Sequence, residues 1–123
     1  MIDYLGKYGY APDSEAMGRS LEMVAANLES IASEQVYKEC FSMMDLTTLK
    51  TNDTPASVTK LVNKVNDFQQ SRQGWPLPAS ICVYPNFASV VKEARKSEFN
   101  ITVVAACFPS SQSFLEVKLR ECE

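Results

Sequence analysis

The sequence places a carboxylate and two hydroxyls beside apolar residues, and these side chains are the first that could do chemistry. Asp45 is followed by Leu46, Thr47 and Thr48 in a run that has the composition of a strand. Burying a carboxylate in such a strand costs free energy unless another group pairs with it or uses it. Because barrel enzymes keep their active-site side chains at the carboxyl ends of strands, Asp45 and Thr47 are candidate site residues. The alternative is that Asp45 is a structural carboxylate that caps a turn.

Two further predicted strands end in side chains of chemical interest. Cys82 and Tyr84 stand at the end of the second strand, and Cys107 stands at the end of the third. An inert core thiol and a thiol that faces a pocket are equally compatible with Cys82. If the strands belong to a barrel, the side chains at their carboxyl ends form the predicted site.

Helices and strands alternate along the part of the chain that must position these residues. The predicted strands cover residues 41–46, 79–84 and 101–107, and the helices after them cover residues 55–68, 86–96 and 113–123. Thr54 followed by Pro55 is typical of a helix start. Strands that are separated by helices pair in parallel with right-handed crossovers, so the expected fold class is α/β.

An earlier helix of about 20 residues is predicted to begin at Asp13 or Ser14. Its apolar side chains recur at spacings of four and three residues and form one stripe: Met17, Leu21, Val24, Leu28 and Ile31. Such a stripe is found on partner-binding helices, in coiled-coil seams and on helices packed against their own domain. The short run of heptads favours the last of these.

Composition excludes several classes of protein. The 123 residues suit one domain, and a net charge of −3 gives no reason to expect a nucleic-acid partner. The chain has no histidine and no Cys-x-x-Cys pair, so neither a histidine-dependent catalytic triad nor an ordinary zinc site is expected. With only four glycines, it also has no phosphate-binding glycine motif, which disfavours doubly wound nucleotide-binding folds.

No run of residues approaches the roughly 20 apolar residues that a membrane span requires. The start of the sequence lacks the basic and apolar regions of a secretory signal. We therefore expect a cytoplasmic protein that does not associate with membranes.

Several short motifs, taken together, resemble those of the deoxyribose-phosphate aldolases. They occur in the order and spacing of that family: Met44-Asp45-Leu46-Thr47-Thr48-Leu49, Asp53-Thr54, Ile81-Cys82-Val83-Tyr84-Pro85, and Phe108-Pro109 followed by Glu116-Val117-Lys118. The resemblance implies that residues 40–123 are the first three β/α units of a (β/α)8 TIM barrel. Residues 1–39 would then be an N-terminal extension with an amphipathic helix. Ser110 and Ser111 stand where many members carry glycine.

The resemblance also implies a class I aldolase that interconverts 2-deoxyribose 5-phosphate with acetaldehyde and glyceraldehyde 3-phosphate, without any cofactor. Asp45 would support the catalytic hydrogen-bond network, and Thr47, Cys82 and Tyr84 would bind substrate. The family's Schiff-base lysine lies beyond Glu123 in the family pattern, so this chain alone is expected to be inactive.

Four lysines of this chain fall on predicted turns or helices and are expected to be surface residues: Lys50, Lys92, Lys96 and Lys118. The alternative function is that of a non-catalytic, truncated barrel that serves as an interaction module. Its open sheet edges would favour self-association.

Overall fold

The computed structural model describes residues 3–123. Its chain divides into two compact units, Met1–Val36 and Tyr37–Glu123. Each unit is described by itself. No helix within the described residues is long and apolar enough to cross a membrane.

The first unit is helical. A single turn, α1 (Tyr4–Lys7), precedes the long helix α2 (Ser14–Ile31). The predicted start of α2 is confirmed, because the Asp13 carboxylate accepts a hydrogen bond of 2.9 Å from the backbone N–H of Ala16. The apolar stripe of α2 predicts that this helix packs against its own domain. No residue of α2 is buried, so the first unit does not cover the stripe.

A helix that the sequence analysis missed, α3 (Glu34–Ser42), spans the boundary of the two units and leads toward the first strand. The predicted strand start at residue 41 is therefore wrong, since Phe41 belongs to this helix. Its ring lies 5.0 Å from that of Phe68 and 6.2 Å from that of Trp75. The ring of Phe41 thus packs against residues that are distant in the sequence.

The second unit contains a small parallel sheet. Its strands are β1 (Asp45–Thr47), β2 (Ser80–Val83) and β3 (Asn100–Val103), and they neighbour one another in sequence order. Both pairings are parallel, as predicted, with Asp45 opposite Ser80 and Cys82 opposite both Thr47 and Thr102. The chain is therefore an α/β protein. The strand order β1-β2-β3 occurs both in the wall of a (β/α)8 barrel and in one half of an open, doubly wound sheet.

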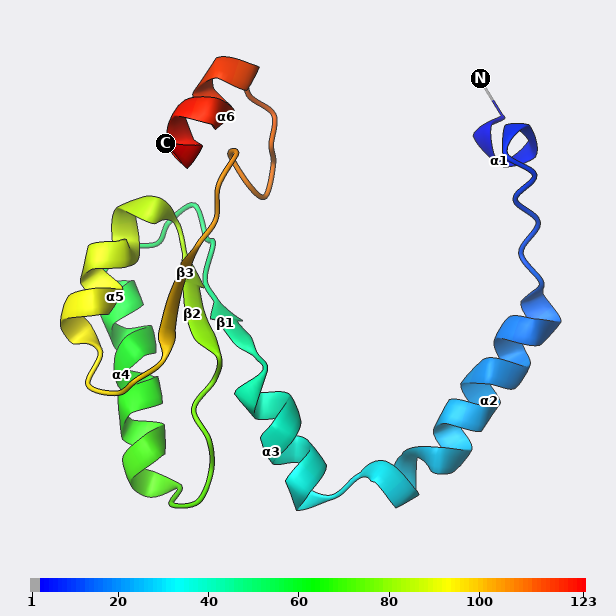
Figure 1. The fold of residues 1–123 in the computed structure, drawn as a ribbon, viewed down its shortest axis with the longest axis horizontal. Coiled ribbons are helices and arrows are strands. Elements are labelled where there is room, and N and C mark those ends of the chain that lie inside the picture. The colour runs from blue at the N-terminus through cyan, green and yellow to red at the C-terminus, as the bar shows by residue number, and fades with distance from the viewer. Residues whose placement is uncertain (1–2) are drawn as a thin grey trace. The chain divides into compact units, whose positions relative to one another are not determined.

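Two helices cover one face of this sheet (Figure 1). The helix α4 (Pro55–Ser71) follows β1 and starts at the predicted cap, where Thr54 and Ser57 exchange side-chain to backbone hydrogen bonds. A turn of 3-10 helix (Pro85–Phe87) and α5 (Ala88–Ala94) follow β2. The buried core between helices and sheet consists of Val58, Val62, Val65, Ile81, Val83, Phe87, Val91 and Phe99.

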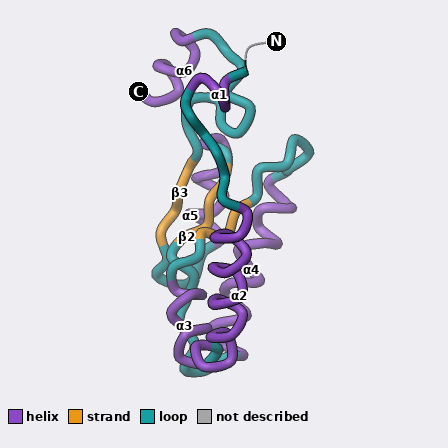
Figure 2. The backbone as a smooth tube through the Cα atoms, turned by 90° about the vertical axis from the view of Figure 1, so that its right-hand side faces the viewer, coloured by secondary structure: helices purple, strands orange, loops and turns teal. Residues whose placement is uncertain are grey.

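The third strand is shorter than predicted. It ends at Val103 rather than at residue 107, and it cannot reach residue 107 because Ala106 and Cys107 have positive φ angles of 56° and 58°, outside the β region. The loop that follows leads to α6 (Leu115–Cys122), close to the predicted helix (Figure 2). Ser111 also has a positive φ, 52°, so it adopts a conformation that favours glycine.

Candidate functional site

The face of the sheet opposite α4 and α5 is polar. Side chains alternate along β2, so that Ile81 and Val83 enter the core while Ser80 and Cys82 lie on the other side. Their register partners on the neighbouring strands are also polar. We call this surface the open face of the sheet, and it is formed by Asp45, Thr47, Ser80, Cys82, Asn100 and Thr102.

A chain of hydrogen bonds crosses the open face from β3 to β1. The Thr102 hydroxyl donates to the Ser80 hydroxyl over 2.8 Å, and the Ser80 hydroxyl in turn donates to the Asp45 carboxylate. Ser80 is 2% exposed, whereas Asp45 is an exposed residue. Asp45 therefore does not carry the burial cost that its apolar neighbours suggest, and its carboxylate is oriented by a buried hydroxyl while still open to a ligand.

Three of the four predicted site residues lie together on this face. Thr47 and Cys82 are register partners, next to the pair formed by Asp45 and Ser80. Thr47 is exposed and its hydroxyl donates to the Asp45 backbone carbonyl over 3.2 Å, whereas Cys82 is buried. The carboxylate, a hydroxyl and a thiol thus converge on one surface of the sheet.

Tyr84 lies apart from these three residues. Its ring packs against the hydrophobic core, and its hydroxyl donates a hydrogen bond of 3.1 Å to the backbone carbonyl of Leu49. That contact ties the end of β2 to the loop that follows β1. In this structure Tyr84 therefore holds a loop that borders the site, and its hydroxyl is engaged by protein.

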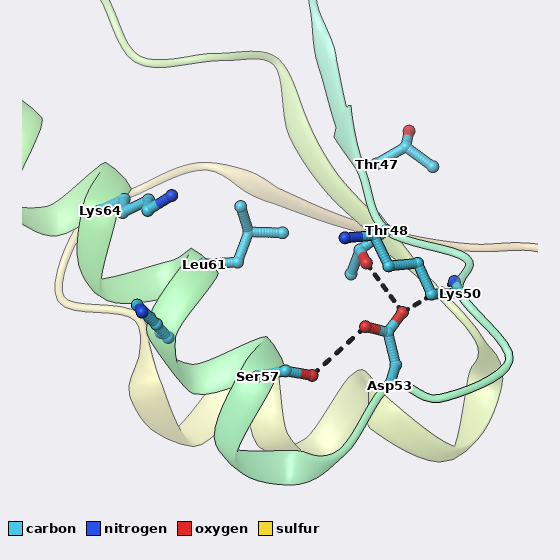
Figure 3. A pocket seen from close by; sticks show the side chains of 8 residues that line it. Thr47, Thr48, Lys50, Asp53, Ser57, Leu61 and Lys64 are labelled. Carbon is cyan, nitrogen blue, oxygen red and sulfur yellow. Dashed lines mark hydrogen bonds between the residues drawn. The ribbon is translucent and has the colours of Figure 1, made fainter.

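A hollow of about 230 Å³ lies where β1 leads into α4 (Figure 3). Residues of the loop and of one flank of α4 line it: Thr47, Thr48, Lys50, Asp53, Ser57, Lys60, Leu61 and Lys64. The Asp53 carboxylate organises the loop side, because it accepts hydrogen bonds from the Thr48 hydroxyl (2.8 Å), the Lys50 backbone N–H (2.9 Å) and the Ser57 hydroxyl (3.3 Å).

These contacts change the acidity of Asp53. Partial desolvation alone would raise its pKa, but the hydrogen bonds from Thr48, Lys50 and Ser57, together with the charge of Lys50, outweigh that effect. The pKa of Asp53 therefore lies below its ordinary value. The carboxylate is ionised at neutral pH and accepts three hydrogen bonds from the protein, which indicates a structural role for this residue.

The four lysines that were predicted to be surface residues lie off the open face. Lys50 is in the loop after β1, Lys92 is in α5, Lys96 follows α5, and Lys118 is in α6. Lys118 is half-buried and the other three are exposed. Among residues 3–123, no group of three histidine, cysteine, aspartate or glutamate side chains is placed to hold a metal ion.

Ser80 and Thr102 are the site residues that sequence reasoning missed. Ser80 is the first residue of β2, and Thr102 is the second residue of the strand predicted over residues 101–107, so neither met the criterion of a position at the carboxyl end. The signal available was a hydroxyl residue at the position of β2 that pairs with Asp45, but using it requires the strand register, which depends on tertiary pairing.

Comparison with known proteins gives one distant similarity, and it agrees with the family that the sequence motifs resemble. No protein-family model matches the chain. A Caenorhabditis elegans protein named "Putative deoxyribose-phosphate aldolase" is 27% identical to it over 121 residues. The match covers 90% of this chain but only 37% of that relative, so the chain spans little more than a third of the relative's length. At this level of identity the chain is similar to that protein over most of its own length.

Proposed function

We propose that this chain forms the first three β/α units of a deoxyribose-phosphate aldolase barrel. In that role it contributes a carboxylate to the site that cleaves 2-deoxyribose 5-phosphate into acetaldehyde and glyceraldehyde 3-phosphate. The observation that carries the proposal is the hydrogen-bonded carboxylate on the open face of the sheet. The similarity to the Caenorhabditis elegans protein supports the same assignment.

The position of Asp45 fits the interior of a barrel. When a parallel sheet closes with its helices outside, the face that carries no helices becomes the inner wall. Here that face carries Asp45, Thr47 and Cys82, while α4 and α5 cover the opposite one. A carboxylate held by Ser80 can accept or return a proton at a bound carbonyl compound without changing its own orientation.

The covalent step of a class I aldolase needs a lysine amine that attacks the substrate carbonyl and forms a Schiff base. None of the strands β1, β2 and β3 contains a lysine. The proposal therefore assigns the nucleophile to a part of the barrel that this chain does not supply. It gives Asp45 a supporting role and predicts that the isolated chain is inactive.

Borohydride trapping tests the proposal in two samples. One is the isolated chain with 2-deoxyribose 5-phosphate, for which mass spectrometry is expected to find no adduct. The other is a chimera in which residues 40–123 replace the matching segment of the Caenorhabditis elegans protein, for which an adduct is expected outside these residues. A chimera that is folded by circular dichroism but forms no adduct, or an adduct on the isolated chain, would contradict the proposal.

A matched pair of variants locates the role of Asp45 in that chimera. Asp45→Asn is expected to lower turnover by about 10- to 100-fold, less than the roughly 100- to 10,000-fold contribution of a general acid or base, because Asp45 has a supporting role. Asp67→Asn makes the same chemical change at an exposed position of α4 and should leave turnover unchanged. Equal effects of the two variants on turnover, or a loss of stability by Asp45→Asn that accounts for its lost turnover, would favour a structural role.

A second candidate function rests on the edges of the sheet. In the described part of the chain, β1 and β3 each pair on one side only, and Val103 on β3 is 43% exposed. Open parallel edges favour pairing with another chain, and a lysine on an edge strand opposes it. If the chain is a non-catalytic interaction module, Val103→Lys should convert an oligomer into a smaller species in sedimentation analysis. An unchanged mass would exclude edge pairing through β3.

A further inference from the structure

The hollow between the end of β1 and the flank of α4 has a chemistry of its own. Thr47 borders it from the open face, but neither Asp45 nor Cys82 lines it. Its lining contains three lysines: Lys50, Lys60 and Lys64. The whole chain carries a net charge of −3, so this group of cations runs against the overall charge of the protein.

The carboxylate in the lining does not pair with all of these lysines. Asp53 accepts three hydrogen bonds from the loop and from α4, and the charge of Lys50 already acts on it. Within the described part of the chain, Lys60 and Lys64 form no ion pair. The hollow therefore has two exposed lysine charges that no described carboxylate pairs with.

The lysine side chains converge on the same space. In Figure 3, Lys50 from the loop and Lys64 from α4 point toward one another across the hollow, with Leu61 between them. Lys60 and Lys64 stand four residues apart on α4, a spacing at which like charges repel and destabilise a helix. An anion in the hollow removes this repulsion, which gives it a favourable free energy of binding.

A phosphate group fits this lining well. A phosphate monoester carries a charge of about −1.5 to −2 at pH 7, so it can pair with two ammonium groups at once. Lysine binds phosphate as a point charge. The volume of about 230 Å³ is many times what one water molecule needs, which leaves room for more than the phosphate. Leu61 supplies an apolar wall for a short carbon chain.

The hydroxyls of the lining are already engaged as donors. Those of Thr48 and Ser57 donate to the Asp53 carboxylate, and that of Thr47 donates to a backbone carbonyl. Each hydroxyl has one proton, so toward a ligand it is only an acceptor. The oxygens of a phosphate dianion are acceptors too, and the lysines are therefore the groups that must hold it.

From these observations we propose that the hollow binds the phosphate group of a small phosphate monoester. Lys50, Lys60 and Lys64 hold the phosphate, and the carbon chain of the ligand lies against Leu61. Inorganic phosphate offers the same group without the carbon chain and is the other source of this chemistry. The inference does not rest on the aldolase proposal, because no step of the aldol reaction takes place in the hollow.

Titration of the full chain with ethyl phosphate and with inorganic phosphate, at constant ionic strength in chloride, tests the site by NMR. Both are expected to shift the backbone amide resonances of Thr48, Lys50 and Leu61 in a saturable way. Ethyl phosphate should bind more tightly, since only its carbon chain reaches Leu61. Tighter binding of inorganic phosphate at these residues would support the site and assign it to the free anion. No shift there, or the same shifts with added chloride alone, would overturn the proposal.

Two double variants with the same change of charge locate the binding. Lys60→Gln with Lys64→Gln removes two cations from the hollow and should weaken the binding of ethyl phosphate by about 10-fold or more, as the loss of a charge-assisted hydrogen bond does. Lys92→Gln with Lys96→Gln removes an equally spaced, exposed pair outside the hollow and should leave the affinity unchanged. Both variants should fold, because glutamine is a good helix former. Equal affinities of the two double variants would contradict the proposed site.

Discussion

The hydroxyl of Ser80 donates a hydrogen bond to the carboxylate of Asp45, its register partner on the neighbouring parallel strand. A serine hydroxyl has one proton, so Ser80 can meet Thr102 only as an acceptor, and the observed 2.8 Å contact has that direction. The two bonds therefore form one directed chain from β3 to β1. Its buried centre at Ser80 fixes the orientation of the exposed carboxylate.

These two consecutive hydrogen bonds predict that Ser80 and Thr102 are energetically coupled. Thr102→Val is expected to lower the free energy of unfolding by about 1 kcal/mol and Ser80→Ala by about 2 kcal/mol, since the first removes one partly buried hydrogen bond and the second removes two. The double variant should lose less than the sum, because removing Ser80 already breaks both bonds. Urea unfolding of the four proteins measures the coupling.

Thr102→Ser is the matched control for this prediction, because it keeps the donor and removes only a methyl group. It should retain the coupling to Ser80. Strictly additive losses in the Ser80/Thr102 cycle would show that the two hydroxyls act separately.

Tyr84→Phe tests whether this residue supports a loop or binds substrate. The change removes the 3.1 Å bond to the Leu49 carbonyl and keeps the ring in the core. We expect a loss of about 1 kcal/mol in the free energy of unfolding by urea. In the chimera, a fall in turnover that exceeds what this instability explains would instead assign the Tyr84 hydroxyl to substrate binding.

The elements that sequence alone predicted well are those with local signals. Thr54 and Pro55 set the start of α4 through a cap and a fixed φ. The strand β2 was predicted because both of its faces are buried, which gives an apolar run that only Ser80 interrupts.

The features that sequence missed depend on distant contacts. Phe41 lies in α3 with its ring against Phe68 and Trp75, and no local pattern reveals those partners. The strand β3 cannot reach residue 107 because Ala106 and Cys107 take left-handed conformations, which their residue types disfavour. Within the candidate site, Asp45 was predicted from its unusual setting, whereas Ser80 required knowledge of the register.

Asn66 is a buried polar residue whose importance follows only from the structure. It is 3% exposed, and its amide donates to the Ala94 carbonyl and accepts from the Lys96 N–H, each over 3.0 Å. These bonds satisfy backbone groups at the end of α5. Asn66→Ala is expected to cost about 2 kcal/mol of unfolding free energy, because it leaves both groups without a partner.

Gln70→Ala is the control for Asn66, since it removes an amide from an exposed position of the same helix. Its cost should stay below about 0.5 kcal/mol, as for most surface substitutions. Similar losses for the two variants in urea unfolding would mean that the bonds of Asn66 contribute little.

The lowered pKa of Asp53 predicts a specific dependence of stability on pH. Because the folded state holds the pKa below its ordinary value of 3.8, the unfolded chain binds more protons in the interval between the two values. The stabilisation is therefore complete above the ordinary value and is lost as the pH falls through the folded one. Asp53→Asn should cost on the order of 0.5 to 1 kcal/mol at pH 7, and this difference from the native sequence should shrink in acid.

Thr48→Val separates the hydrogen bonds of Asp53 from its charge. It removes the 2.8 Å donor while the carboxylate remains, so the part of the stability that depends on pH should become smaller without disappearing. Urea midpoints measured from pH 7 down to the acid limit of folding compare the three proteins. If the native chain and Asp53→Asn lose stability in parallel across that range, the three donors around Asp53 do not favour its ionised form, and the loop after β1 is held by its backbone bonds alone.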